Sequence, residues 1–383
     1  MNTTGEMLRL AVLWNELPQY LAACLRELVE RYPVDLTVYE PGSAALPPRD
    51  RHPYREETFS WIPRRVKLVS GVGERSRELE EDLDQFRPRA ALVCGWAYPA
   101  YRSAARRLRA SGALVVGACD NNWAGSIRQT VGVLAGRWLL GRCFDALWVP
   151  GERAARLAVR LGYSGERLWH GFYAGDYDRF ARVARKRLAA PGTGWPSRFL
   201  FVGRLEKIKG LETLLVAYRR YRRSVERPWE LWCAGSGSLA GLLEGEPGIR
   251  RLGFLDPEGL EVAFESCGAF VLPSLHDPWG VVIHEAASAG LPVFCTRTCG
   301  ASVELVQDGL SGALLEPGDV AALVRVLVRC SSGDYDLRAM GERSFRLAGR
   351  YSPAQWAGYF AGALDRAAGI KLHRAASADS ART

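Results

Sequence analysis

The segment LPSLHDPWGVVIHEAASAGLPVF, residues 272–294, carries the clearest structural signal in this sequence. Its apolar beginning predicts a buried strand that ends near Ser274, and its apolar centre predicts a helix that begins near Gly280 and stops at Gly290. A strand that leads through a short loop into a helix is the repeating unit of a parallel sheet covered by helices. The stretch therefore predicts an α/β protein whose loop lies at the carboxyl end of the sheet, where ligands bind in such folds.

Two carboxylates flank the start of this predicted helix. Asp277 precedes the helix, and Glu285 lies about one and a half turns inside it. The N–H groups of Gly280 and Val281 have no partner within the helix, so they can bind a phosphate while the carboxylates accept hydrogen bonds from sugar hydroxyls. Ser274, at the strand end, is a further candidate for substrate contact. The alternative interpretation makes Asp277 an N-cap and Glu285 a solvated helix residue.

The segment FVGRLEKIKG, residues 201–210, predicts a second unit of the same kind. Its strand ends at Gly203, and Arg204 and Lys209 flank the loop that precedes the next helix. Two cations beside a helix start form a strong site for a diphosphate. The alternative is a basic surface loop, and the residue order differs from that of a GxxxxGK[ST] phosphate loop.

A third strand end, WCAGSGS at residues 232–238, carries Gly235 and Gly237. Glycines let a nucleotide approach the backbone closely, so both are candidate substrate contacts. A tight turn between a strand and a helix explains them equally well.

Short apolar runs alternate with amphipathic segments along the whole chain. In the first half, strands are expected at residues 8–14, 34–40, 66–70, 90–96, 113–119 and 146–150. A basic segment rich in Pro and Gly at 185–198 predicts a linker, after which the alternation restarts. Two such arrays predict two doubly wound, Rossmann-like parallel-sheet domains that face each other across a cleft. The first domain is expected at residues 1–185 and the second at residues 197–350. A helix at 351–370 is expected to pack back on the first domain, and the tail at 371–383 is expected to be disordered.

The charge is concentrated in the first half of the chain. Residues 1–190 hold 29 Lys/Arg and 21 Asp/Glu, a difference of +8, while the remainder holds 22 and 21, a difference of +1. A basic face attracts phosphates or acidic lipids, and the sequence carries no zinc finger or RNA-recognition signature, so no nucleic-acid partner is expected. The apolar segment 126–144 contains three arginines and predicts either a buried helix, which is favoured, or a helix on a membrane surface.

Other features predict a cytoplasmic protein. The N-terminus lacks the features of a signal peptide, and no apolar run reaches the ~18–20 residues of a membrane helix. Peripheral contact with the inner face of a membrane stays open. The nine cysteines include no CxxC pair, so they are expected to be reduced and structural.

The segments G-R-L…K-G and D-P-W-G-x-x-x-x-E-A-x-x-x-G-x-P-V together resemble the GT-B-fold, retaining glycosyltransferases of family 4 (group 1 type). The resemblance implies that a sugar is transferred from a UDP- or GDP-linked donor with retention of configuration and without a metal or other cofactor. Arg204 and Lys209 match the diphosphate-binding pair of the family, and Glu285 matches its ribose-binding glutamate. Asp277 replaces the glutamate that holds the donor sugar, which leaves the identity of the sugar open.

The resemblance also implies roles for the two domains. The first would bind the acceptor, whether a glycan, a lipid-linked saccharide or a small molecule, and the second the nucleotide sugar. Many relatives carry a histidine after a strand of the first domain, near the donor sugar, and Asp120 in VVGACDNNW stands at the comparable position, which makes it a candidate catalytic residue beside Arg204, Lys209 and Asp277. The glycine-rich first loop of many relatives is replaced by a loop that begins at Asn15, which is expected either to touch the acceptor or to cap a helix.

Two other functions fit the same pattern. A nucleotide-sugar epimerase of this architecture would need acid and base residues at the sugar and no acceptor. The second function is that of a non-catalytic protein that binds sugar nucleotides or anionic lipids. The absence of the usual histidine is compatible with this function. The two D-x-D segments, residues 176–178 and 334–336, are interpreted as structural loops rather than metal sites.

Overall fold

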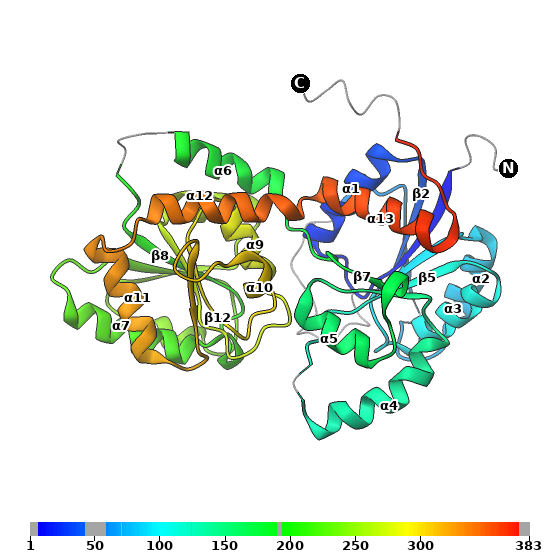
Figure 1. Ribbon diagram of the computed structural model, residues 1–383, viewed down its shortest axis with the longest axis horizontal. Helices are drawn as coiled ribbons and strands as arrows, with labels where there is room; N and C mark the ends of the chain where they lie inside the picture. Colours follow the sequence, from blue (N-terminus) through cyan, green and yellow to red (C-terminus); the bar gives the residue numbers. More distant parts are fainter. Residues whose placement is uncertain (1–6, 43–58, 70, 124, 190–193, 375–383) are drawn as a thin grey trace. The chain divides into compact units, whose positions relative to one another are not determined.

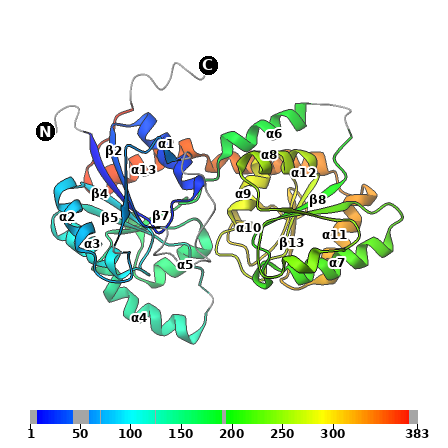
Figure 2. The ribbon, with the colours of Figure 1, turned by 180° about the vertical axis from the view of Figure 1, so that it is seen from behind.

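The computed structural model describes residues 7–42, 59–69, 71–123, 125–189 and 194–374. The chain divides into two compact units, residues 1–174 with 353–383, and residues 175–352. Each unit contains one parallel sheet with helices packed against it, as Figures 1 and 2 show from opposite sides. Within the described ranges, none of the helices has the length and apolar character needed to cross a bilayer.

The first unit is built on a seven-stranded sheet in the order β3-β2-β1-β4-β5-β6-β7. Its strands are β1 (Leu8–Leu13), β2 (Val34–Pro41), β3 (Arg64–Leu68), β4 (Ala90–Val93), β5 (Leu114–Ala118), β6 (Ala146–Trp148) and β7 (Leu168–Trp169). Its helices are α1 (Gln19–Arg31), α2 (Arg77–Phe86), α3 (Pro99–Ala110), α4 (Ile127–Gly141), α5 (Glu152–Arg160) and α13 (Pro353–Ala368). The order reverses between β1 and β4, so this pair is the switch point of the sheet.

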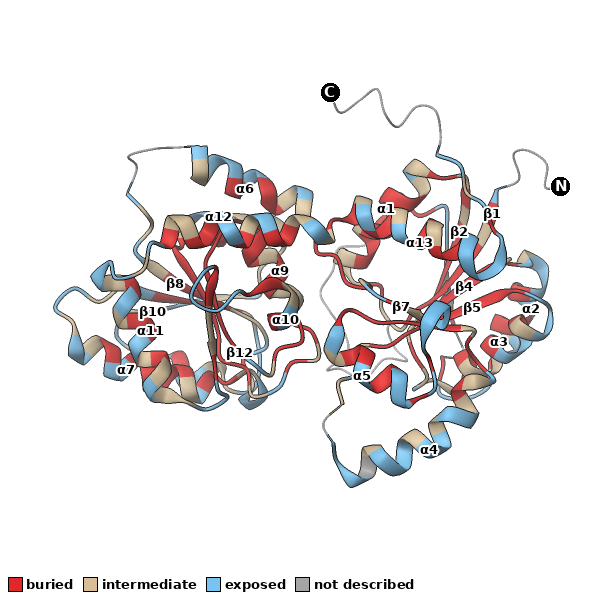
Figure 3. Ribbon diagram, viewed as in Figure 1, coloured by how far each residue is buried: buried red, intermediate tan, exposed pale blue. Residues whose placement is uncertain are grey.

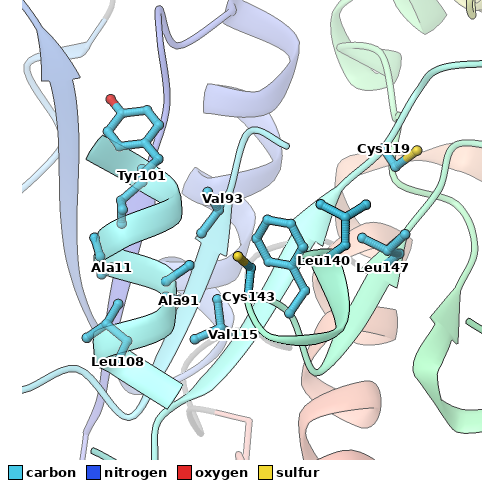
Figure 4. Close-up of a cluster of buried hydrophobic side chains, with 14 of the residues drawn as sticks. Ala11, Ala91, Val93, Tyr101, Leu108, Val115, Cys119, Leu140, Cys143 and Leu147 are labelled. Carbon is cyan, nitrogen blue, oxygen red and sulfur yellow. The ribbon is translucent and has the colours of Figure 1, made fainter. Parts of the chain in front are cut away.

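The core of the first unit explains why these segments form strands. Every residue of β4 and β5 is buried, as expected for strands covered on both faces. Figure 4 shows Tyr101 and Leu108 of α3 together with Leu140 and Cys143 around the sheet. The last helix completes this unit, because Trp356 of α13 donates its indole N–H to the Phe172 carbonyl at 2.7 Å. All nine cysteines lie in the described part of the chain and are free.

The second unit is built on a six-stranded sheet in the order β10-β9-β8-β11-β12-β13. Its strands are β8 (Arg198–Val202), β9 (Glu230–Ala234), β10 (Ile249–Gly253), β11 (Ala269–Leu272), β12 (Val293–Thr296) and β13 (Gly312–Leu315). Its helices are α6 (Tyr177–Ala189), α7 (Leu211–Ser224), α8 (Pro257–Ser266), α9 (Val281–Ser288), α10 (Ser302–Leu305), α11 (Val320–Ser332) and α12 (Leu337–Ala348). Here the order reverses between β8 and β11, and both predicted strand–loop–helix segments begin on these strands.

The predicted fold class is confirmed, and the main difference concerns the junction between the units. The basic segment expected to be a linker begins as the last turn of α6, which belongs to the second unit. Phe180 of this helix is buried against Phe264, with ring centroids 5.2 Å apart. The chain therefore passes into the second unit at Gly175, ten residues before the expected boundary at 185. Residues 190–193 of the expected linker and 375–383 of the expected tail lie outside the described residues.

Candidate functional site

In the second unit, the loops that follow β8 and β11 are bonded to each other. The two strands pair in parallel, with Phe199 opposite Ala269. Beyond their carboxyl ends, the Leu275 N–H donates to the Ile208 carbonyl at 2.9 Å. The two stretches singled out in the sequence therefore meet at the switch point of this sheet, where open α/β sheets bind their ligands.

An ion pair joins the same two loops. Lys209 Nζ lies 2.5 Å from Asp277 Oδ2, and the two side chains are only 16% and 6% exposed. Lys209 is followed by Gly210, whose φ is 72° and whose added Cβ would lie 1.9 Å from the Pro273 carbonyl oxygen. Only glycine fits this turn, which brings Lys209 to the strand ends. The pair neutralises a buried carboxylate beside a predicted anion site.

A third loop, which follows β12, supports the Asp277 loop from the other side. The Gly300 N–H donates to the Asp277 carbonyl at 3.0 Å, and the Ala301 N–H donates to the Trp279 carbonyl at 2.8 Å. An added Cβ on Gly300 would lie 2.0 Å from the Pro278 carbonyl oxygen, so glycine is required for this contact. The position of Asp277 is thus fixed by loops from three neighbouring strands.

The start of α9 is open to an anion. Gly280 precedes the helix with a left-handed φ of 86°, and no side chain of the described residues caps it. The next two residues, Val281 and Val282, are partly exposed. Asp277 accepts the Lys209 ammonium instead of a helix N–H, so its alternative interpretation as an N-cap is not what the structure shows. The free N–H groups and the positive end of the helix dipole favour a phosphate here.

Glu285 is not an ordinary solvated helix residue. It is half-buried, and the loss of water around its carboxylate raises its pKa to about 7, with the charge of Asp176 adding a smaller contribution in the same direction. A carboxyl group in this state changes its charge near neutral pH and gains from hydroxyl partners that stabilise its ionised form.

His284, the neighbour of Glu285, joins α9 to both segments where the chain enters and leaves this unit. Its Nδ1 accepts the Gly175 N–H at 2.6 Å, and its Nε2 lies 3.0 Å from the Ala348 carbonyl. These partners fix the tautomer, with the proton on Nε2. Burial lowers the pKa of His284 to about 4, so the ring is neutral at pH 7.

Arg204 and its surroundings complete the edge of the site. Arg204 is exposed, and no carboxylate of the described residues lies within ion-pair distance of it. Its neighbour Glu206 accepts hydrogen bonds from Ser238 N and Oγ at 2.8 and 2.6 Å. The Arg204 loop is thereby attached to the strand end that carries Gly235 and Gly237.

The first unit contains a cavity at its own switch point. Its volume is about 410 Å³, and it lies at the carboxyl ends of β1, β4 and β5. Its lining includes both residues predicted for this unit, Asn15 and Asp120, together with the aromatic residues Trp14, Tyr20, Phe172 and Tyr173. A concave site of apolar rings with a few polar groups is the usual form of a small-molecule site.

Asp120 is held in place by this aromatic wall. Tyr173 donates its hydroxyl to Asp120 Oδ2 at 2.9 Å, and the Tyr20 ring packs edge-on against Tyr173 with centroids 5.1 Å apart. Helix α1 is preceded by Pro18 and has no side-chain cap among the described residues. The loop from Asn15 therefore does not cap α1 and instead lines the cavity.

Comparison with known proteins gives a family match over part of the chain and a fold for both units. Residues 196–332 match the family described as Glycosyl transferases group 1. A glycogen synthase of Mycobacterium tuberculosis is 36% identical over 155 residues, which cover 39% of this chain and 36% of the relative. A D-inositol 3-phosphate glycosyltransferase of Corynebacterium jeikeium is 34% identical over 193 residues, which cover 46% and 44%. The chain thus spans less than half the length of these relatives.

Solved structures extend the likeness to both units. Anabaena HepE in complex with UDP is similar with a TM-score of 0.71 at 15% identity, over 94% of this chain and 100% of that one. The lipopolysaccharide outer core galactosyltransferase WaaB is similar with a TM-score of 0.67 at 13% identity, over 94% and 99%. The chain has the GT-B fold. Its two Rossmann-like units account for the two arrays expected from the sequence.

Within this GT-B fold, three of the predicted contacts have structural roles of their own. An added Cβ on Gly235 would lie 1.9 Å from the Gly203 carbonyl oxygen, and one on Gly237 would lie 2.5 Å from that of Leu205. Both glycines are therefore needed for backbone packing, and their contact with a substrate stays a prediction. Ser274 is fully buried, and its carbonyl accepts the hydroxyl of Thr296 at 2.6 Å.

Gly203 differs from these glycines. Its added Cβ would meet only the Phe201 ring, at 3.6 Å, which is ordinary contact. The protein itself therefore leaves room for a side chain at Gly203. An absent side chain at a strand end beside Arg204 is the feature expected where a ligand approaches the backbone.

Sequence reasoning missed several residues of the two sites. The only sequence signal for the supporting loop at 299–301 is Gly300 in TCGA, which follows a predicted strand end. In the sequence, Asp176 is distinguished only as part of a D-x-D segment interpreted as a structural loop, whereas in the structure its charge adds to the raised pKa of Glu285. Tyr173 carried no signal in the sequence, because its partner Asp120 is 53 residues away.

Proposed function

We propose that this protein is a glycosyltransferase of family 4 that transfers a sugar from a UDP- or GDP-linked donor to an acceptor, with retention of configuration. The observation that carries this proposal is the arrangement at the switch point of the second sheet. There the cation of Lys209, the exposed Arg204 and the uncapped start of α9 surround the ends of β8 and β11. Such a set of groups fits a diphosphate, and Glu285 adds a carboxylate for the hydroxyls of a ribose.

The chemistry follows from stabilising the leaving group. The bond between the anomeric carbon and the diphosphate oxygen breaks, and its electron pair stays on the diphosphate. Lys209, Arg204 and the N–H groups at Gly280 and Val281 stabilise the negative charge that develops there, without a metal ion. The acceptor hydroxyl attacks from the same face, and its proton passes to the departing phosphate oxygen. Asp277 keeps Lys209 in place and is the candidate group for contact with the donor sugar.

The cavity of the first unit is the candidate acceptor site. Its rings offer apolar faces, and Asp120 and Asn15 offer hydrogen-bonding groups. These groups suit a hydroxyl-rich acceptor such as a glycan, a lipid-linked saccharide or a polyhydroxylated small molecule. The resemblance to family 4 supports this division between donor and acceptor sites, and the UDP bound by HepE supports a nucleotide-sugar donor.

A ligand screen tests the proposal. Thermal unfolding of the protein is followed in EDTA with UDP, GDP, UDP-glucose and GDP-mannose. A ligand that binds the folded protein, and not the unfolded chain, raises Tm. We expect one nucleotide series to stabilise the protein. Arg204→Gln should lose this stabilisation, and Arg220→Gln, a control on another exposed arginine of the same unit, should keep it.

Product analysis then identifies the reaction. The stabilising donor is incubated with the protein alone and with candidate acceptors, and the anomeric configuration of any product is read by NMR. Transfer with retention supports the proposal. An epimerised nucleotide sugar without transfer, or a strict requirement for a divalent metal, would contradict it.

A further inference from the structure

Helix α4 exposes a row of large apolar side chains. Ile127, Val131, Leu134 and Trp138 are 84%, 63%, 69% and 64% exposed. At 100° per residue, these four positions fall within an arc of roughly 60° on the helix surface. Figure 3 shows that most of α4 is exposed. The buried helix favoured from the sequence is therefore wrong for this face. We call Ile127, Val131, Leu134 and Trp138 the α4 stripe.

The opposite face of α4 fixes the orientation of the stripe. Val133 and Leu140 pack against the core of the first unit. An added Cβ on Gly136 would lie 2.8 Å from Leu161 Cδ2, so the helix lies close to the end of α5. Because small and apolar residues anchor this inner face, the α4 stripe cannot turn inward without undoing the packing.

The sequence of α4 and its immediate flanks is cationic. Residues 121–144 contain Arg128, Arg137 and Arg142 and no Asp or Glu. The Arg142 guanidinium lies over the Trp138 ring, 3.6 Å from its centroid, and both side chains are exposed. A tryptophan that carries an arginine on its face combines an apolar body with a charge, which suits the boundary between lipid headgroups and acyl chains.

We propose that the α4 stripe binds the surface of a membrane that contains anionic lipids. The helix lies in the plane of the membrane, with its four apolar side chains among the acyl chains and Arg137 and Arg142 among the headgroup phosphates. The first unit, residues 1–174 with 353–383, holds 28 Lys/Arg and 21 Asp/Glu, and this excess of +7 adds a long-range attraction to such a surface. A second copy of the chain fits less well, since four side chains offer only a few hundred square ångströms, against the roughly 800 Å² that each partner buries in a stable interface.

Flotation with vesicles tests this proposal, and it is independent of glycosyl transfer because no catalytic readout is used. The full-length protein is mixed with vesicles of phosphatidylcholine alone or with phosphatidylglycerol added. We expect binding to the anionic vesicles, weakened by salt. Val131→Asp should weaken this binding at least about tenfold, because two methyl groups that the bound membrane covers are replaced by a charge that the anionic lipids repel.

A matched control separates the stripe from a general effect of charge. Val262 on α8 is 62% exposed, so Val262→Asp changes the same residue type at the same exposure in the other unit. We expect it to bind as the unchanged protein does. A second readout is quenching of tryptophan fluorescence by brominated acyl chains, which should decrease in Trp138→Phe.

Three results would overturn the proposal. The first is that the unchanged protein does not float with anionic vesicles. The second is that Val131→Asp and Val262→Asp have equal effects. The third is a dimer in sedimentation velocity that Val131→Asp dissociates while vesicle binding is unchanged, which would assign the stripe to a second copy of the chain.

Discussion

The ion pair between Lys209 and Asp277 allows stability and function to be separated by substitution. Lys209→Met keeps the aliphatic stem and removes the charge. The buried carboxylate of Asp277 then lacks the cation with which it is paired. Asp277→Asn removes the opposite charge. The double variant removes both charges and leaves two side chains of nearly the original size. The three variants form a double-mutant cycle around the 2.5 Å contact.

The structure sets the size of the effect. Two unit charges at this separation attract by roughly 6–7 kcal/mol at an effective dielectric constant of about 20. Desolvation of the two charges offsets much of this, and breaking a fully buried pair from one side costs about 3–5 kcal/mol. Lys209 is 16% exposed and Asp277 6%, so we take the lower end, about 3 kcal/mol, for Lys209→Met. The double variant should recover most of that loss, because no buried charge is left unpaired.

Activity should follow a different pattern. Loss of one preorganised group that stabilises a leaving oxyanion costs about 10²–10³ in kcat. The double variant lacks that group as Lys209→Met does, so it should regain stability but not turnover. Urea unfolding and initial rates with the stabilising donor measure the two properties. A double variant that regains both would refute the phosphate role of Lys209, and equal instability of the single and double variants would refute the buried-pair argument.

Three further predictions concern single residues. The pKa of Glu285 in the folded protein, about 7, lies above its ordinary value of 4.5, so the free energy of unfolding should fall by at most about 3 kcal/mol as pH rises from about 4.5 to 7. Glu285→Gln should flatten this slope in urea titrations at several pH values. Gly203→Ala should leave Tm within 2–4 °C, or ~1 kcal/mol, but weaken donor binding about tenfold or more in calorimetry, since its Cβ would clash with the ligand and not with the protein. Gly175→Ala should lower the free energy of unfolding by about 2–3 kcal/mol in the same urea assay, because its Cβ would lie 2.4 Å from His284 Nδ1. Gly194→Ala is the control, since its Cβ would have no neighbour within 4 Å, and equal effects of the two variants would contradict the contact.

The sequence predicted those parts of the fold whose signal is local. The strand-loop-helix unit around Gly280 was visible because an apolar run, a glycine and a second apolar run follow each other within a few turns. The same holds for Gly210, where the glycine between Lys209 and Leu211 marks the turn. In both cases the chemistry of the loop and its position in the chain are set by neighbours in sequence.

Features that depend on distant partners could not be predicted in this way. The basic end of α6 resembles a linker in composition, and its membership of the second unit depends on contacts such as Phe180 with Phe264. The apolar segment of α4 predicted burial, because hydrophobicity alone does not tell which face of a helix the core covers. The spacing of Ile127, Val131, Leu134 and Trp138 places them on one face of a helix. Only the packing of the opposite face shows that this face points outward.

One helix combines the two properties that a donor site of this kind needs. The start of α9 offers N–H groups to an anion, and Glu285 on the same helix offers a carboxylate whose charge is sensitive to its surroundings. One residue earlier, His284 bonds the backbone at Gly175 and at Ala348. A shift of α9 on ligand binding would therefore strain hydrogen bonds at both segments where the chain enters and leaves the unit. Because the neutral ring accepts from one segment and donates to the other, protonation below a pKa of about 4 would break the bond to Gly175 first.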